Sequence, residues 1–182
     1  ISADDFPELE VNEEQESTEV QSGALKRILT KTSFSMASQD VRYYLNGLLL
    51  ELTEGEIKGV ATDGHRLALS SSKTKENSLA MRNILPRKAV LELAKLLSPE
   101  DTPIALLVGP TYIGIKTESL NFSSKLIDGK YPDYEKVFPS GDPLPLMVGK
   151  EILQSALSRA SVLSNEKYRG VRFELSKGSL KL

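Results

Sequence analysis

The sequence contains no cysteine and no tryptophan, and its single histidine is His65. Without cysteine, the chain has no disulfide, no thiolate metal site and no cysteine nucleophile. One histidine cannot supply a histidine cluster for zinc, and a Ser-His-Asp site would have to use His65. No apolar run reaches the roughly 18 residues that a membrane-spanning helix needs, and the first residues lack the pattern of a signal peptide. We therefore expect a protein without a metal site and without a membrane partner.

Basic residues are absent from the beginning of the chain. Residues 1–20 contain eight of the 25 acids and none of the 23 bases, which leaves 23 bases against 17 acids in residues 21–182. An acidic leader thus precedes a basic body. One interpretation is a solubilising segment beside a normally charged domain, and the other is a body that attracts a polyanion. The overall composition, with 40% apolar and 26% charged residues, is typical of a globular protein.

Apolar residues at helical spacing predict three helices, over residues 22–36, 86–97 and 153–160. In the first helix, Ser22 is the expected N-cap and Met36 is the last residue of the apolar stripe. In the second, Pro86 stands at the start, where its missing N–H is not needed, and Ser98-Pro99 ends the helix.

The remaining β-rich runs predict strands over residues 47–53, 56–62, 66–71, 103–108, 112–117 and 120–126. We expect tight turns between them at Glu54-Gly55, Asp63-Gly64, Gly109-Pro110 and Glu118-Ser119. The order is a strand, a helix and three strands, and then the same again. This order indicates an α+β fold with antiparallel sheets and excludes the alternating βαβα order of a nucleotide-binding sheet.

A longer repeat underlies this order. Three blocks recur at offsets of 123–128 residues: Phe6–Glu10 with Tyr131–Glu135, Gly47–Leu52 with Gly170–Leu175, and Leu25, Leu29 and Lys31 with Leu153, Leu157 and Arg159. A period of this length is typical of a domain and too long for a solenoid repeat. We therefore predict a complete domain in residues 16–138, preceded by the end of a similar domain and a linker in 1–15 and followed by the start of a third in 139–182. Since the chain begins at Ile1 and ends within an expected strand, we also expect a fragment.

Four segments carry a family resemblance: Gln39–Gly47, Ala61–Ala68, Ser124–Tyr134 and Ser164–Arg172. In these motifs, and over essentially its whole length, the chain resembles the bacterial DNA polymerase III beta subunit, the sliding clamp. The resemblance implies a DNA clamp fold, in which a (βαβββ)2 domain has antiparallel sheets outside and two helices on its inner face. It also implies three such domains per subunit, a head-to-tail homodimer that closes a ring around duplex DNA, and a cytoplasmic location at the bacterial nucleoid.

Basic residues lie on all three expected helices, away from the apolar stripes. A solvated helix face explains each of them singly, but their shared bias favours a wall that attracts phosphate without reading bases. The resemblance implies that the helices line the central hole and that three residues of the following loop approach DNA. An alternative interpretation makes the two loop tyrosines anchors of that loop. The candidate DNA-binding residues are Lys26, Arg27, Lys31, Gln39, Tyr43, Tyr44, Arg87, Lys88, Lys95 and Arg159.

Asp63 and His65 lie two residues apart, as an acid and a base in a catalytic site could. No Gly-x-Ser-x-Gly elbow accompanies them, and a hairpin turn in which Asp63-Gly64 takes the left-handed positions explains them better. The resemblance implies a third interpretation, a pocket with an apolar floor and a polar rim that captures short Gln/Leu/Phe-rich motifs. Lys136 stands beside it, where many relatives have arginine. The candidate pocket residues are Arg42, Leu45, Thr62, Gly64, His65, Arg66, Leu67, Pro132 and Val137.

The resemblance implies a non-enzymatic processivity clamp. The sequence has no Gly-x-x-x-x-Gly-Lys-Ser/Thr loop, so we expect neither nucleotide hydrolysis nor a cofactor. The implied partners are duplex DNA, the catalytic subunit of the replicative polymerase, clamp-loader subunits, and other polymerases and repair proteins that carry the peptide motif. The alternatives are a linear, non-specific DNA-binding module without ring closure and a hydrolase centred on Asp63 and His65. We expect the chain alone to be monomeric. We also expect it to bind peptides weakly, because the family's pocket takes one wall from the end of the third domain.

Overall fold

Two repeats of one element order build the larger of the chain's two compact units, Ile1–Asp133. The structure, a computed structural model, describes residues 16–75, 79–138, 141, 145–164 and 170–182. The first repeat consists of β1 (Glu16–Gln21), α1 (Ser22–Thr32), β2 (Gly47–Thr53), β3 (Glu56–Thr62) and β4 (Leu67–Lys73). The second consists of β5 (Met81–Pro86), α2 (Arg87–Leu96), β6 (Pro103–Val108), β7 (Tyr112–Lys116) and β8 (Asn121–Lys125). The predicted α+β class and (βαβββ)2 order are confirmed.

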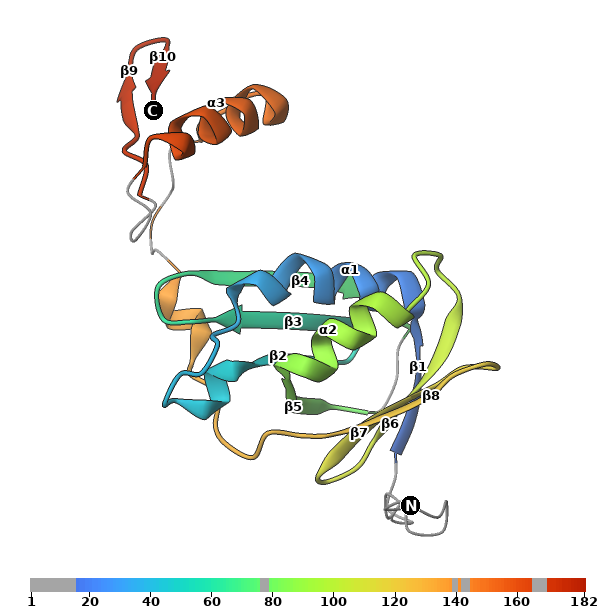
Figure 1. Cartoon of the computed structure of the whole chain (residues 1–182). Helices are drawn as coiled ribbons and strands as arrows, with labels where there is room; N and C mark the ends of the chain where they lie inside the picture. Colours follow the sequence, from blue (N-terminus) through green and yellow to red (C-terminus); the bar gives the residue numbers. More distant parts are fainter. Residues whose placement is uncertain (1–15, 76–78, 139–140, 142–144, 165–169) are drawn as a thin grey trace, which may run out of the picture. The chain divides into compact units, whose positions relative to one another are not determined.

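The two repeats exchange their first strands (Figure 1). β5 joins the first repeat in a sheet of order β4-β3-β2-β5, and β1 joins the second in a sheet of order β1-β6-β7-β8. All neighbouring strands are antiparallel, with Leu48 opposite Leu85 and Val20 opposite Ile104. Because each sheet contains strands from both repeats, neither repeat can complete its sheet alone.

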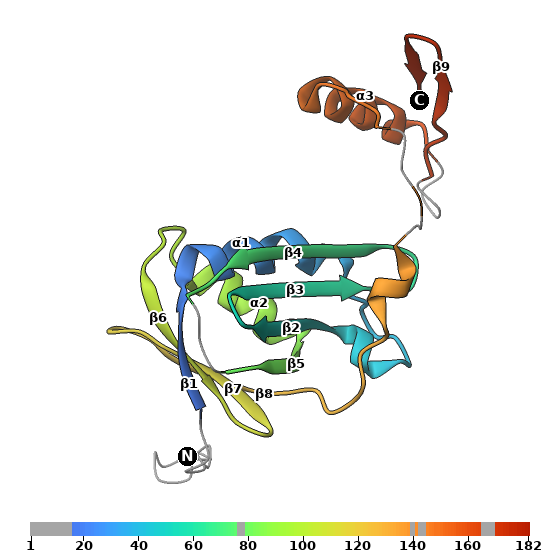
Figure 2. The ribbon, with the colours of Figure 1, turned by 180° about the vertical axis from the view of Figure 1, so that it is seen from behind.

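Helices α1 and α2 lie side by side on one face of the β4-β3-β2-β5 sheet, and Figure 2 shows the same sheet from behind. α1 contacts β3 and β4, whereas α2 contacts β2 and β5. Each helix buries its apolar stripe, with Leu25, Ile28 and Leu29 on α1 and Val90 and Leu93 on α2. These side chains join apolar residues of both sheets in one core, which leaves the polar side of each helix outward.

The ends of α1 differ from the sequence prediction. Gln21, the last residue of β1, is the N-cap, and Ser22 is the first helical residue, whose hydroxyl donates to the Ser98 carbonyl oxygen at 3.2 Å. The helix ends at Thr32, whose hydroxyl donates to the carbonyl oxygen four residues earlier at 2.7 Å. A 3-10 turn, η2 (Ser33–Ser35), then carries Met36 back onto the core, where it is 3% exposed. Met36 is therefore a core residue, as its spacing suggested, but it lies outside the helix.

The other predicted elements of this unit agree closely with the structure. β2, β3 and β6 have the predicted bounds, and those of β4, β7 and β8 differ by one or two residues. α2 begins after Pro86 and ends at Leu96. Gly55 and Gly64 take the expected positive φ angles of 79° and 88°. A second 3-10 turn, η3 (Tyr43–Asn46), precedes β2.

The second unit is Tyr134–Leu182, and its described residues contain one α-helix and one hairpin. Its elements are η4 (Tyr134–Val137), α3 (Lys150–Val162), β9 (Glu174–Ser176) and β10 (Ser179–Lys181). The predicted third helix is confirmed, whereas the repeat block Phe6–Glu10 lies outside the described residues. The domain boundaries at 15/16 and 138/139 stay predictions. Across the described residues, no helix is long and apolar enough to span a membrane.

The close approach of α1 to β3 depends on Gly59. A Cβ atom at this position would lie 2.4 Å from Cγ2 of Ile28. Ile28 is β-branched and only 1% exposed, so it cannot turn aside without disturbing the core. The absence of a side chain at Gly59 therefore sets the distance between helix and sheet.

Gly59→Ala is expected to lower the free energy of unfolding by about 1–3 kcal/mol, because the added methyl group overpacks this contact. Gly114→Ala in β7 is the matched control, since a Cβ there meets its nearest neighbour at 3.3 Å. Chemical denaturation of both variants measures the difference. Equal losses in the two variants would show that the Gly59 contact is not special.

Candidate functional site

The outward sides of α1 and α2 carry the predicted cationic wall. Because each helix buries one stripe, Arg27 and Lys31 on α1 and Lys88 and Lys95 on α2 are left exposed. The helices lie next to each other on one sheet face (Figures 1 and 2), so these four cations belong to one side of the first unit. The structure thus brings together basic residues that are far apart in the sequence.

Two of the predicted phosphate contacts, Lys26 and Arg87, also hold the fold together. Lys26 is half-buried, and its Nζ donates to the Leu97 carbonyl oxygen at 2.7 Å, at the C-terminal end of α2. A cation at this place compensates the unpaired carbonyl groups and the negative end of the helix dipole. Arg87 is half-buried too, and its Nη1 donates to the Met36 carbonyl oxygen at 3.2 Å. Both side chains therefore have less freedom to reach a ligand than the sequence prediction supposed.

Two further cations are paired with acids at the surface. Arg27 Nη1 lies 3.3 Å from Asp101 Oδ1, and Lys95 Nζ lies 3.0 Å from Glu92 Oε1. Exposed pairs of this kind contribute only about 0.2–1 kcal/mol to stability. A polyanion can therefore compete with the acids for both cations.

Lys31 and Lys88 are exposed, and neither has an ion pair with another described residue. Arg159 lies on α3 in the second unit, where its Nη1 donates to Ser155 Oγ at 2.7 Å. Its place beside the other cations stays a prediction. The charge on the α1–α2 side is thus sparse and partly compensated, which suits loose attraction better than tight gripping.

The predicted DNA contacts after α1 lie in a strained loop. Gln39 has a φ of 59° and is the one non-glycine residue with a positive φ within the described ranges. Tyr43 and Tyr44 pack edge to face, with ring centroids 5.7 Å apart. A Cβ at Gly129 would lie 3.3 Å from Cε2 of Tyr43, so this ring also rests against the 127–132 segment. The two rings anchor each other, and Tyr43 remains 57% exposed.

The predicted pocket residues meet at the loop between β3 and β4. Thr62 Oγ1 donates to the Arg66 carbonyl oxygen at 2.7 Å and accepts the Gly64 N–H at 3.0 Å. Arg42 reaches the loop from the start of η3, and its Nη2 donates to the Asp63 carbonyl oxygen at 3.2 Å. A Cβ at Gly64 would lie 3.1 Å from Arg42 Nη1. The positive φ favours glycine here, and a side chain at this position would also displace the Arg42 guanidinium slightly.

Asp63 serves the turn. Its Oδ1 accepts the backbone N–H groups of His65 and Arg66 at 2.9 and 3.0 Å, and its Oδ2 accepts Arg66 Nε–H at 3.0 Å. Burial tends to raise the pKa of Asp63, but these donors outweigh it and the pKa lies below its ordinary value. The predicted turn is confirmed, although only Gly64 takes a positive φ. Since both carboxylate oxygens are engaged within the loop, Asp63 is poorly placed to orient His65 as a base.

Sequence reasoning missed Asp40, which organises the same region. Its Oδ1 accepts the backbone N–H and Nε–H of Arg42 at 2.8 and 3.0 Å, and its Oδ2 accepts Nη2–H at 2.8 Å. The backbone of Asp40 exchanges two hydrogen bonds with the Asn46 side chain, at 2.9 and 2.8 Å. Hydrogen bonding to the Arg42 side chain lowers the pKa of Asp40 to about 2. The spacing of Asp40 and Arg42, two residues apart, could have indicated this ion pair from the sequence.

The apolar pocket residues differ in exposure. Leu45 is 2% exposed, so it supports the site from beneath and offers little surface of its own. Leu67 is half-buried and Pro132 is exposed. Val137 is 65% exposed and belongs to the second unit, so its place in the pocket stays a prediction.

A third segment, residues 127–132, is anchored at the same end of the sheet. Ile127 forms an isolated antiparallel bridge with Ile84. Tyr131 is 3% exposed, and its hydroxyl oxygen accepts the Thr62 N–H at 3.0 Å. Burial raises the pKa of Tyr131 to about 12. Pro132 is therefore carried toward the β3–β4 loop by an ordered chain.

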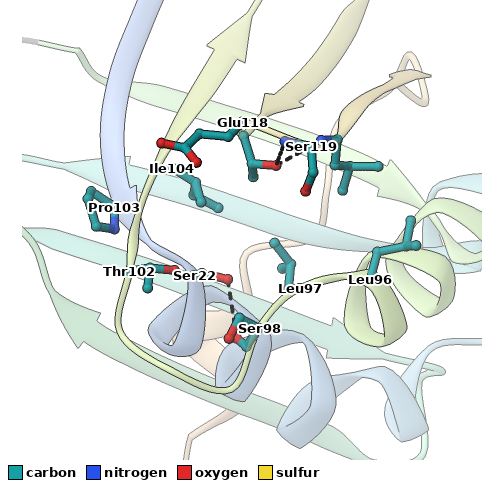
Figure 3. Close-up of a pocket in the computed structure, with 11 residues that line it drawn as sticks. Ser22, Leu96, Leu97, Ser98, Thr102, Pro103, Ile104, Glu118 and Ser119 are labelled. Atoms are coloured by element: carbon teal, nitrogen blue, oxygen red, sulfur yellow. Dashed lines mark hydrogen bonds between the residues drawn. The ribbon is translucent and has the colours of Figure 1, made fainter.

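A separate pocket of about 470 Å³ lies at the C-terminal end of α2 (Figure 3). Leu96 and Leu97 line one part of it and the turn at 118–120 another, and the Ser22–Ser98 hydrogen bond lies in its wall. None of the candidate peptide residues lines this pocket. The predicted peptide site and this pocket are therefore different places on the first unit.

The chain is similar in sequence to one protein family and to several of its members. The family model described as the central domain of the DNA polymerase III beta subunit matches residues 19–133. Over 183 residues, the chain is 44% identical to the beta sliding clamp of Pseudomonas aeruginosa, and over 182 residues it is 41% identical to that of Escherichia coli K12. Each alignment covers 100% of this chain and 50% of the relative. The chain thus spans about half the length of the curated relatives it matches.

Solved structures share the fold. The crystal structure of the DNA polymerase III subunit beta from Pseudomonas aeruginosa matches with a TM-score of 0.93 at 45% identity, over 99% of this chain and 50% of that one. The DNA polymerase sliding clamp from Bacillus subtilis matches with a TM-score of 0.84 at 28% identity, over 91% of this chain and 44% of that one. The predicted clamp fold is confirmed by both.

Removal of the Arg42 guanidinium is expected to raise the pKa of Asp40 from about 2 toward its ordinary value of about 3.9. Arg42→Gln keeps a polar side chain but removes the charge, and NMR titration of the Asp40 carboxyl carbon measures the shift. Any stability from this pair is present above the ordinary pKa and is lost as the pH falls through about 2. The Asp63 carboxyl, held by donors of its own loop, is the internal control and should titrate almost unchanged. A pKa of Asp40 that stays near 2 in the variant would contradict this assignment.

Proposed function

Because the chain belongs to the family of DNA polymerase III beta subunits, the bacterial beta sliding clamps, we propose that it forms part of a ring that encircles duplex DNA and tethers a DNA polymerase. One observation carries the proposal: a chain 44% identical to a beta sliding clamp presents two adjacent helices with a shared, sparsely cationic side. The chain spans half of its relatives, so the activity is proposed for the complete subunit.

The outward side of α1 and α2 meets the DNA backbone. Lys31 and Lys88 attract phosphate groups without reading base edges, so binding is independent of sequence. The exposed part of Tyr43 and the neighbouring Gln39 extend this surface at the end of α1. Because several of the cations are already paired or hydrogen-bonded within the protein, attraction is weak. Weak contacts let the protein move along the duplex without friction.

Retention on DNA comes from ring closure. Two complete subunits associate head to tail as a homodimer, and the closed ring cannot leave a circular duplex whatever its affinity for phosphate. A separate, ATP-driven clamp loader opens the ring. The chain alone supplies part of the inner wall and is monomeric, and Arg159 on α3 adds to the same wall in the complete subunit.

Partner proteins dock at the β3–β4 loop through a short Gln/Leu/Phe-rich motif. Leu67 and Pro132, supported by Leu45, receive the apolar anchors, and Val137 adds to this floor. His65, Arg66 and the backbone at Gly64 form the polar rim and orient the peptide by hydrogen bonds. The partners are the catalytic subunit of the replicative polymerase, clamp-loader subunits, and other polymerases and repair proteins that carry such a motif.

The protein is non-catalytic and acts in the bacterial cytoplasm, at the nucleoid. The engagement of both Asp63 carboxylate oxygens within the turn supports this proposal over a hydrolase centred on Asp63 and His65. The alternative that remains is a linear, non-specific DNA-binding module without ring closure. A closed ring leaves DNA through a free end, whereas a linear module is released by salt from circular and linear DNA alike.

Retention on circular DNA distinguishes the two. In a chimaera, residues 1–182 replace the matching half of the Pseudomonas aeruginosa beta sliding clamp, so that a complete subunit is present. After loading onto a nicked circle, the chimaera is expected to resist high salt and to leave when the circle is cut once, because a ring slides off a free end. Gel filtration of the DNA before and after cutting measures the retained protein.

Lys31→Glu/Lys88→Glu in the same chimaera is the matched variant. It should weaken binding to linear DNA at low salt, because two attractive charges are reversed. Once loaded, it should stay on the circle as firmly as the parent. A dimeric chimaera that salt releases equally from circles and from linear DNA would establish the linear module instead.

A further inference from the structure

Phe34 lies at the surface near the β3–β4 loop, and the core does not account for its position. It is the middle residue of η2 and is 57% exposed. Its neighbours Ser35 and Met36 are buried, at 0% and 3% exposure. The turn that buries these neighbours therefore presents the Phe34 ring to solvent at a fixed place.

The ring of Phe34 faces the guanidinium group of Arg66. Arg66 Cζ lies 5.7 Å from the ring centroid, which is within the range of a cation–π contact. At the same time Arg66 Nε donates to Asp63 Oδ2 at 3.0 Å. The guanidinium is thus held at its edge by its own loop and on its face by the turn after α1, although the Arg66 side chain is 58% exposed.

An exposed arginine normally samples many rotamers, and fixing it on a ligand costs conformational entropy. The two contacts of Arg66 reduce this freedom before any ligand binds. Within the described residues, only Nε of its guanidinium donates a hydrogen bond. Nη1 and Nη2 therefore remain available, in a fixed orientation, for acceptors outside the protein.

We propose that Phe34 is a positioning residue of the peptide site, whose ring holds the Arg66 guanidinium so that its Nη groups donate to a carbonyl oxygen of the docked peptide. This inference rests on the proposed peptide docking. Phe34 does not itself touch the peptide, and it acts through Arg66 alone. The peptide site accordingly extends beyond its own loop to the turn that ends α1.

Phe34→Leu and Phe34→Tyr separate the electrostatics of the ring from its bulk. Leucine keeps an apolar side chain but has no π face, whereas tyrosine keeps the face. Because Phe34 is 57% exposed, neither variant should lose stability, and thermal denaturation checks this. The probe is a fluorescein-labelled synthetic peptide that contains Gln, Leu and Phe, titrated with the full chain by fluorescence anisotropy.

Phe34→Leu is expected to weaken peptide affinity roughly two- to fivefold, and Phe34→Tyr to leave it unchanged. In NMR spectra, the ring-current shift of the Arg66 Nε–H should vanish in Phe34→Leu and persist in Phe34→Tyr. In an Arg66→Ala background, Phe34→Leu should have no further effect, because the two residues act as one unit. Leu67→Ala should weaken binding in every background, since it removes part of the apolar floor.

The outcomes separate this inference from the proposed function. Absence of binding to the parent chain, or full binding by Leu67→Ala, would contradict the proposed peptide site. If Phe34→Leu binds the peptide as tightly as the parent chain, the role of Phe34 is overturned and the peptide site stands. The same holds if Phe34→Leu still weakens binding in the Arg66→Ala background. A parent chain without the ring-current shift would overturn it independently of any peptide.

Discussion

The exchange of first strands between the two βαβββ repeats is the constraint on which the rest of the structure depends. β1 pairs with β6 and β5 pairs with β2, and each helix starts at the residue after its exchanged strand, α1 at Ser22 and α2 at Arg87. The first turn of each helix is thereby fixed to a sheet that its own repeat does not complete. Both helices then share one core and one sheet face, so the cations on their outer sides form a common surface.

Periodicity predicted most of the secondary structure, because the strands and helices of the first unit have clear apolar faces and short turns. It failed at the end of α1, where Met36 continues the helical spacing although the helix stops at Thr32. The core requires an apolar side chain at the position of Met36, and the η2 turn places the Met36 side chain there as a continued helix would. The strand exchange was not predictable from local pattern, since pairing of β1 with β6 joins segments more than 80 residues apart.

For the candidate site, the sequence predicted which residue types are present, but it could not predict the hydrogen-bond partners of their side chains in the folded protein. Lys26 and Arg87 looked like free cations on helix faces, yet each donates to a carbonyl group that the fold brings from a distant segment. In the same way, the Phe34 ring gains a role only because the β3–β4 loop places Arg66 over it. A local sequence determines charge, size and polarity, whereas the partner of each group is set by tertiary structure. The two ligand surfaces proposed here consequently share the segment between α1 and β2, where Gln39 and Tyr43 alternate with Arg42 and Leu45.

The absence of cysteine permits a direct test of the claim that the α1–α2 side meets DNA. A cysteine-free chimaeric clamp is given one cysteine by Lys31→Cys, Lys88→Cys or Lys125→Cys, and each cysteine carries the same photo-crosslinker. Lys125 is exposed on β8, in alternation with the half-buried Phe122 and Ser124, and so points away from the core and the helices. On loaded circular DNA, we expect crosslinks to DNA from positions 31 and 88 and almost none from position 125. Crosslinking from position 125 that equals or exceeds that from the two helix positions would contradict the claim.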